Sequence, residues 1–162
     1  MGPQEIYHLL ESRGLWYETD HFSSHEELIS KTSDQLRYPA GDAKNLFLRD
    51  DKRREYYLLT VREGRQVDLK EFRRQHGTRP LFFASEDELM ELLGLLPGTV
   101  TPIALLHDRE HRVHWFLDRV LLEAPGIIDL HPNDGTVILW MRTRELIDLL
   151  AEQEIPATLA DF

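Results

Sequence analysis

The chain has 162 residues, of which 41% are hydrophobic and 30% charged, as is ordinary for a soluble globular protein of about one domain. It contains no cysteine, which excludes disulfides, thiolate zinc sites and a cysteine nucleophile. No apolar run approaches the roughly 18 residues of a membrane span, and the N-terminal residues lack the order of a signal peptide. We therefore expect a cytoplasmic protein without a membrane partner.

The formal net charge of −10 argues against nucleic acid as a partner, because phosphates are bound by cations. Residues 44–79, however, contain eleven Lys or Arg and six Asp or Glu, a local balance of +5, so the rest of the chain carries −15. Screening limits the reach of each charge to roughly 8–10 Å at physiological salt, so an acidic protein can still present one basic face. An ordinary solvated surface explains the charge pattern equally well.

Five segments combine helical spacing of apolar residues with capping signals. Ser85 and Glu88 form a capping box, and Gly94 is expected to end the helix that follows. Asp68 and Thr143 are expected to cap the helices at residues 69–75 and 144–153. The expected helices cover residues 3–13, 25–31, 69–75, 86–93 and 144–153.

Short apolar and β-branched runs predict strands, and turn-rich segments between them predict three hairpins, within residues 44–61, 103–117 and 127–140. The strand at 81–83 is expected to be buried, and 118–123 fits a helix or a strand. The expected strands cover residues 15–19, 44–50, 56–61, 81–83, 103–106, 113–117, 127–130 and 136–140. Interleaved helices and hairpins predict a single α/β domain over residues 1–162, with a mixed, largely antiparallel sheet or partial barrel and surrounding helices.

Lys44 and Asn45 stand at the start of a strand that is expected to be buried, where a rigid scaffold can direct their side chains. Ammonium and amide groups supply hydrogen-bond donors that can hold a phosphate or a developing oxyanion. From spacing alone, a surface lysine and a turn asparagine are favoured by about three to one.

A second candidate site is the loop Gly98-Thr99-Val100-Thr101-Pro102, which prolines stiffen at both ends. Glycine permits close approach of the backbone, and backbone N–H groups can bind an oxyanion without any change of protonation. As a bare pattern, a plain helix-to-strand connection has the same composition.

His131 follows an apolar strand and precedes Pro132, which favours an extended conformation. Its imidazole could hydrogen-bond a substrate or water near neutral pH, and a structural histidine fits equally well. Other histidines cluster in sequence, but their spacing matches no zinc motif, and zinc sites need three or four converging ligands. We therefore expect no metal. The clustered histidines are His21, His25, His107, His111 and His114.

These three motifs, in this order, resemble the freestanding aminoacyl-tRNA editing domains of the YbaK/ProX type, which are related to the insertion domain of bacterial prolyl-tRNA synthetase. The resemblance runs from about Glu18 to the C-terminal helix, and the segment KNLFLRD at residues 44–50 is closer to the ProX type. It implies that Lys44, Gly98 and His131 are catalytic and that no cofactor is needed. The substrate-binding residues that it implies are Asn45, Thr99, Val100, Thr101 and Pro102.

In the mechanism that the resemblance implies, Lys44 and Asn45 hold the terminal nucleotide, the loop at Gly98 orients water, and His131 shapes the aminoacyl pocket. The sequence departs from the family at residues 21–24, where His-Phe-Ser-Ser replaces the common His-Pro-Pro, and at the short turn 133–135. Both departures concern the amino-acid pocket.

The resemblance implies a trans-acting deacylase for mischarged tRNA(Pro), most closely Ala-tRNA(Pro). A synthetase site sized for proline rejects smaller groups by only about 1–3 kcal/mol per methylene, so a second, smaller pocket is useful. The expected partners are the acceptor end of tRNA(Pro) and prolyl-tRNA synthetase. Basic residues that could meet the acceptor stem through its backbone and shape are Lys52, Arg53, Arg54, Arg73 and Arg74.

Three alternative functions stay open from the sequence. The chain could remove cysteine or another amino acid from tRNA, or it could be a non-catalytic regulator of the same fold that binds tRNA or a synthetase. An acidic interaction domain without an RNA role is the third alternative. Deacylation of charged tRNA separates these classes.

Overall fold

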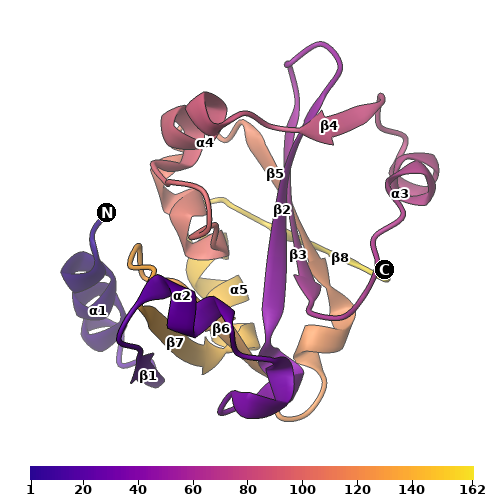
Figure 1. Cartoon of the computed structure of the whole chain (residues 1–162). Coiled ribbons are helices and arrows are strands. Elements are labelled where there is room, and N and C mark those ends of the chain that lie inside the picture. Colours follow the sequence, from indigo (N-terminus) through magenta and orange to yellow (C-terminus); the bar gives the residue numbers. More distant parts are fainter.

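The computed structural model describes residues 1–162 and contains two open β-sheets with helices packed around them (Figure 1). One sheet has the strand order β1-β7-β6 and the other β4-β2-β3-β5-β8. The strands are β1 (Tyr17–His21), β2 (Ala43–Asp50), β3 (Tyr56–Arg62), β4 (Leu81–Phe83), β5 (Val113–Asp118), β6 (Ile127–Leu130), β7 (Val137–Arg142) and β8 (Ala157–Ala160). The β3–β5 and β5–β8 pairs are parallel and the others antiparallel, which confirms the expected mixed, largely antiparallel α/β architecture.

Helices cover both sheets, and none is long and apolar enough to cross a membrane. The α-helices are α1 (Pro3–Ser12), α2 (His25–Ile29), α3 (Leu69–His76), α4 (Glu86–Leu93) and α5 (Thr143–Ala151). The 3-10 helices are η1 (Ser33–Gln35), η2 (Pro39–Gly41), η3 (Pro102–His107) and η4 (Arg119–Leu122). The caps predicted at Asp68, Ser85 and Gly94 are confirmed. Ser24 also accepts a hydrogen bond at a helix start, and Gly77, like Gly94, ends its helix with φ of 66°.

The β2–β3 hairpin is buried on both of its faces, as the unbroken apolar runs predict. Phe47 and Leu58 belong to the main core between the sheets, whereas Leu48 and Leu59 belong to a smaller cluster under α3. Successive residues of a strand point to opposite faces, so each strand serves both clusters. Burial on both faces makes the hairpin rigid, so it holds the side chains at the start of β2 in place.

The three-stranded sheet is likewise covered on both faces. Leu139 and Met141 of β7 face the main core, whereas Ile138 and Trp140 pack with Leu28 of α2. Full burial of such a side chain contributes roughly 1.5–3 kcal/mol, which is enough to fix a five-residue helix that would be unstable alone. Leu28 therefore sets the position of α2 on this sheet.

One predicted hairpin is wrong. Residues 103–106 lie in the 3-10 helix η3, which begins at Pro102, and β5 pairs in parallel with β3 and β8 instead. Pro102 has the fixed φ that suits a first helical position and has no N–H for a strand ladder. The segment 118–123, which the sequence left open, contains η4.

Three smaller expectations are also corrected. Strand β4 lies at a sheet edge, and Phe82 and Phe83 are 49% and 65% exposed, so this strand is not buried. Thr143 is the first residue of α5 and donates to the carbonyl of Leu121 at 2.8 Å, while Arg142 occupies the capping position. Strand β8 has no counterpart in the sequence prediction, because its only partner is the distant β5.

Candidate active site

The first and second motifs are joined through Asn45. Its Nδ2 donates to the carbonyl of Val100 at 3.2 Å, and its Oδ1 accepts from Thr60 Oγ1 at 2.7 Å. Thr60 Oγ1 in turn accepts from Trp115 Nε1 at 3.0 Å. This buried relay fixes which way the amide points, so β2 holds the loop before η3 at a set distance.

The second and third motifs are joined through Thr101, which is buried. Its Oγ1 accepts from the backbone N–H of His131 at 3.4 Å, and His131 Nδ1 donates to the carbonyl of Val137 at 3.4 Å. Thr99 Oγ1 donates instead to Leu96 within its own loop, and Pro102 is buried at the start of η3. The loop therefore uses Val100 and Thr101 to connect β2 with the end of β6.

A histidine that the sequence prediction did not place in the site completes the group. His25, the first residue of α2, donates from Nδ1 to the carbonyl of Gly135 at 2.8 Å. A Cβ built on Gly98, whose φ is +90°, would lie 3.1 Å from His25 Nε2. The sequence carried a weak signal for this residue, since Ser24 caps α2, but only tertiary structure brings α2, the Gly98 loop and the β6–β7 turn together.

Beside this group lies a pocket of about 490 Å³. It lies between α2, the start of β2 and the ends of β6 and β7, and His131 is the one predicted catalytic residue in its wall. The residues that line it are Leu28, Ile29, Lys31, Thr32, Ser33, Leu36, Asp42, Ala43, Glu63, Gly64, Asp129, His131 and Ile138.

The pocket contains two carboxyl groups in unequal environments. Asp129 is 7% exposed and its Oδ1 accepts from the N–H of Ala43 at 2.9 Å, while Asp42 Oδ2 accepts from Ser33 Oγ at 2.6 Å. Burial raises the pKa of Asp129 well above its ordinary value, and the neighbouring Asp42 carboxylate raises it further. Asp129 therefore holds its proton more tightly than an ordinary aspartate.

Burial also lowers the pKa of His131, because a buried imidazolium loses its hydration. The bond to Val137 and the charge of Asp42 oppose this shift, and His25 adds to it. His131 is therefore neutral at physiological pH. Because its Nδ1 donates to a carbonyl, Nε2 is the acceptor of the ring.

Lys44 is not part of this group. Its Nζ donates to the carbonyl of Arg65, on the face of β2 that also carries Leu46 and Leu48. Asn45, one residue further, points to the opposite face and to Val100. The expectation that both side chains hold the same nucleotide is thus not met in this conformation, because neighbouring residues of a strand point apart.

The predicted RNA-contacting residues lie away from the site. Lys52, Arg53 and Arg54 are in the β2–β3 loop, about 16 Å or more along the strand from Asn45 at roughly 3.3 Å per residue. Arg73 and Arg74 lie on α3, at the other face of the five-stranded sheet (Figure 1). Two of the five already have carboxylate partners: Arg53 lies 3.8 Å from Glu88, and Arg74 pairs with Glu71.

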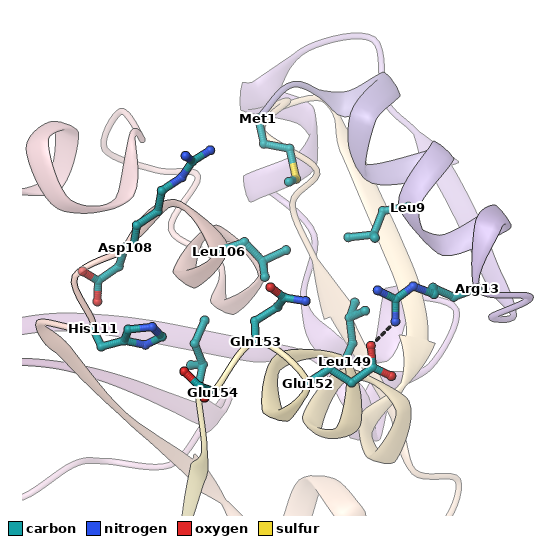
Figure 2. Close-up of a pocket in the computed structure, with 12 residues that line it drawn as sticks. Met1, Leu9, Arg13, Leu106, Asp108, His111, Leu149, Glu152, Gln153 and Glu154 are labelled. Carbon is teal, nitrogen blue, oxygen red and sulfur yellow. Dashed lines mark hydrogen bonds and ion pairs between the residues drawn. The ribbon is translucent and has the colours of Figure 1, made fainter.

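A larger pocket of about 600 Å³ lies between α1, η3 and α5, and it contains none of the predicted site residues (Figure 2). Arg13 of α1 and Glu152 after α5 form an ion pair across its rim. His111 and Glu154, both with positive φ, also line it.

Residues 26–149 match the family described as the aminoacyl-tRNA editing domain, and this range includes all three motifs. The chain belongs to this family. Asn45, the Gly98 loop and His131, which are far apart in sequence, thus meet within one matched domain.

Curated relatives give the same family. The prolyl-tRNA editing protein ProX of Acetoanaerobium sticklandii is 40% identical over 103 residues, which cover 64% of this chain and 62% of that protein. The prolyl-tRNA synthetase associated domain-containing protein 1 of Danio rerio is 38% identical over 120 residues, which cover 74% of this chain and 65% of that protein. The chain thus spans somewhat less than two thirds of the length of these relatives.

Solved structures share the fold. One described as a candidate trans-editing enzyme for prolyl tRNA synthetase superposes with a TM-score of 0.70 at 22% identity, covering 98% of this chain and 94% of that one. A hypothetical protein superposes with a TM-score of 0.70 at 20% identity, covering 97% of both chains. At these identities the likeness concerns the fold.

Proposed function

We propose that this chain is a trans-acting deacylase that hydrolyses the ester of mischarged tRNA(Pro), with alanine as the amino acid removed. The observation that carries the proposal is the joining of three separated motifs by the Asn45–Val100 and Thr101–His131 hydrogen bonds. The family of the chain supports it, as do relatives that are prolyl-tRNA editing or prolyl-tRNA synthetase associated proteins.

The chemistry required is modest, because an aminoacyl ester is already activated. Gly98 is exposed, and its backbone N–H needs no proton transfer to stabilise the oxyanion of the tetrahedral intermediate, whereas the N–H of Thr99 already donates to the carbonyl of Leu96. Asn45 keeps this loop in place through Val100, and preorganised donors are worth far more than flexible ones. In this proposal Gly98 binds the oxyanion and His131 forms a wall of the aminoacyl pocket.

The pocket beside His131 suits a small aminoacyl group. Leu28, Leu36 and Ile138 supply apolar walls for a methyl side chain. Asp42 and Asp129 bring carboxyl oxygens into the pocket, which can accept hydrogen bonds from the ammonium group carried by every aminoacyl ester. Discrimination by exclusion of a larger ring is the logic of a second, smaller sieve.

Lys44 takes part in this proposal only if its side chain leaves the carbonyl of Arg65. Lys44 is the second residue of β2, next to Ala43 in the pocket wall. A lysine stem has four rotatable bonds, so its ammonium can reach the phosphate of a terminal nucleotide at the strand end. Asn45 would then act through the loop and Lys44 through the nucleotide.

The acceptor end of tRNA(Pro) is the proposed partner, and prolyl-tRNA synthetase a second one. Lys52, Arg53 and Arg54 are too far from the pocket for the terminal nucleotide, so they, with Arg73 and Arg74, would contact the acceptor stem. Such contacts are read mainly through phosphates and shape, and weaken with salt.

The test is deacylation of alanyl-, cysteinyl- and seryl-tRNA(Pro) by the intact chain. We expect turnover of alanyl-tRNA(Pro) above the other two and a loss of about tenfold to a hundredfold in Lys44→Ala. Lys70→Ala, at an exposed position of α3, is the matched control. Tight binding of charged tRNA without turnover would instead identify a regulator. Faster turnover of cysteinyl-tRNA(Pro) than of alanyl-tRNA(Pro) would identify cysteine, and not alanine, as the amino acid removed.

A further inference from the structure

His25 is held by two segments that are distant from it in sequence. Ser24 caps α2 by accepting from the N–H of Glu27 at 3.0 Å, which fixes the backbone on either side of His25. The ring then donates from Nδ1 to the carbonyl of Gly135 at 2.8 Å. An imidazole with a capped backbone and an anchored ring edge has one orientation.

The partner of Nδ1 determines the tautomer of the ring. A carbonyl oxygen can only accept, so Nδ1 carries the proton in the neutral imidazole and Nε2 carries the lone pair. A carbonyl on Nδ1–H also makes the opposite nitrogen more basic, as in the histidines of metal and triad sites. Nε2 makes no hydrogen bond within the protein, so His25 presents an unused acceptor.

Nε2 faces the loop that is proposed to bind the oxyanion. A Cβ on Gly98 would lie 3.1 Å from Nε2, and a Cβ on Gly135 would lie 2.8 Å from Nδ1, so neither position has free space for a side chain. Gly98 is exposed and His25 half-buried, so this edge of the ring lies near the protein surface. The two glycines bring the backbone close to the imidazole on both sides.

We propose that His25 is the general base of the deacylation, an inference that rests on the proposed function. Nε2 accepts a proton from water as the water oxygen bonds to the carbonyl carbon of the ester. The carbon–oxygen bond to the ribose then breaks, and the imidazolium returns the proton to the departing ribose oxygen. The products are the free amino acid and the tRNA hydroxyl, and the imidazole is neutral again.

His131 is less suited to this step. Burial lowers the pKa of its imidazole, so the charged form that a base must pass through is disfavoured. A positive charge on His25 would lower the pKa of His131 further, so His131 stays a neutral wall of the pocket.

The decisive variant is His25→Asn, assayed with alanyl-tRNA(Pro). The Asn amide can still donate to Gly135 but has no group at the Nε2 position, so the anchor remains while the acceptor is lost. We expect kcat to fall about 10²–10³-fold, the range of a general base, with KM within about threefold of the wild type. His8→Asn is the matched control, since His8 is exposed on α1, away from the pocket.

Retained kcat in His25→Asn, or a raised KM at unchanged kcat, would overturn the inference. A wild type without turnover on any charged tRNA would overturn the proposed function itself, and is thus distinguishable. If His25→Asn does not fold, ¹⁵N NMR of the neutral wild-type ring decides. A proton on Nδ1 supports the inference, and a proton on Nε2 contradicts it because that nitrogen would then be a donor.

Discussion

Two of the molecule's pockets are of similar size and differ in character. The one between α1, η3 and α5 is larger, at about 600 Å³, and Arg13 and Glu152 form an exposed ion pair across it, while its buried carboxyl, Asp108, accepts from the backbone N–H groups of Arg112 and Val113 (Figure 2). The one beside His131, at about 490 Å³, is walled by the buried carboxyl of Asp129 and the half-buried imidazole of His131. In the second pocket the pKa values of Asp129 and His131 are both shifted by burial.

The difference shows that volume does not locate the chemistry. Shifted pKa values concentrate where a fold places ionisable groups away from water, and such placement is costly unless it is supported by function or by hydrogen bonds. The pocket beside His131 also adjoins the three motifs, whereas the larger one touches none of them. Substitutions in each pocket test which of the two holds the reaction.

Among the variants that compare the two pockets, the largest expected effect comes from His131→Ala. Removal of the imidazole opens the pocket wall and leaves the carbonyl of Val137 without its side-chain donor, while the backbone N–H of residue 131 still donates to Thr101. We therefore expect kcat/KM for alanyl-tRNA(Pro) to fall about 10²-fold. Gln153→Ala, at an exposed position in the larger pocket, should leave activity within about twofold. If Gln153→Ala alone reduced turnover, the reactive site would lie in the larger pocket.

A smaller loss is expected for Gly98→Ala. The residue has φ of +90°, and its new Cβ would lie 3.1 Å from His25 Nε2, so the ring or the loop must move. We expect about a tenfold to hundredfold lower kcat, together with roughly 1–2 kcal/mol of backbone strain.

Gly77→Ala is the matched control, because it introduces similar backbone strain without a close contact to His25. Gly77 has φ of +66°, and a Cβ at this position would have no atom within 4 Å. Thermal melts should show a similar loss of stability in both variants, while only Gly98→Ala loses turnover. Equal activities would mean that the approach of Gly98 to His25 has no part in the reaction.

Local features of this fold could be predicted because their causes lie within a few residues. The capping box at Ser85 and the left-handed glycine at Gly94 depend only on neighbouring backbone groups, and both occur where the sequence places them. The strand predicted at 103–106 failed because apolar content alone does not distinguish a buried strand from a buried helical turn. Strand β8 was missed because its parallel partner β5 lies some forty residues earlier.

In the candidate site, too, some residues carry a local sequence signal and others are placed only by the tertiary structure. The loop at Gly98 and the strand end at His131 carry local signals, and the structure brings them together through Thr101. Lys44 shares a motif with Asn45, yet the alternation of a strand directs the two side chains to opposite faces. His25 has no motif at all, and its importance emerges only from its approach to two glycines in remote loops.

The smallest expected effect concerns the free energy of unfolding. It compares the buried carboxyl of Asp129 with the exposed ion pair of Arg13 and Glu152. Because its pKa is raised in the folded state, Asp129 binds its proton more tightly when folded than when unfolded. The free energy of unfolding therefore falls as the pH rises from about 3.9, the usual unfolded value, to the folded pKa. Asp129→Asn removes this fall, since the amide keeps an acceptor for Ala43 and can donate to Asp42.

Urea titrations from pH 3 to pH 8 measure the effect. We expect Asp129→Asn to match the wild type near pH 3 and to exceed it at pH 8 by about 1.4 kcal/mol for each tenfold difference in proton affinity. Arg13→Ala, which breaks the exposed pair with Glu152, should change stability by about 1 kcal/mol or less at every pH. A variant Asp129→Asn that is less stable than the wild type at pH 8 would show that the ionised carboxyl stabilises the fold. Ionisation of the buried carboxyl would then cost no more in the smaller pocket than ionisation of an exposed one does in the larger pocket.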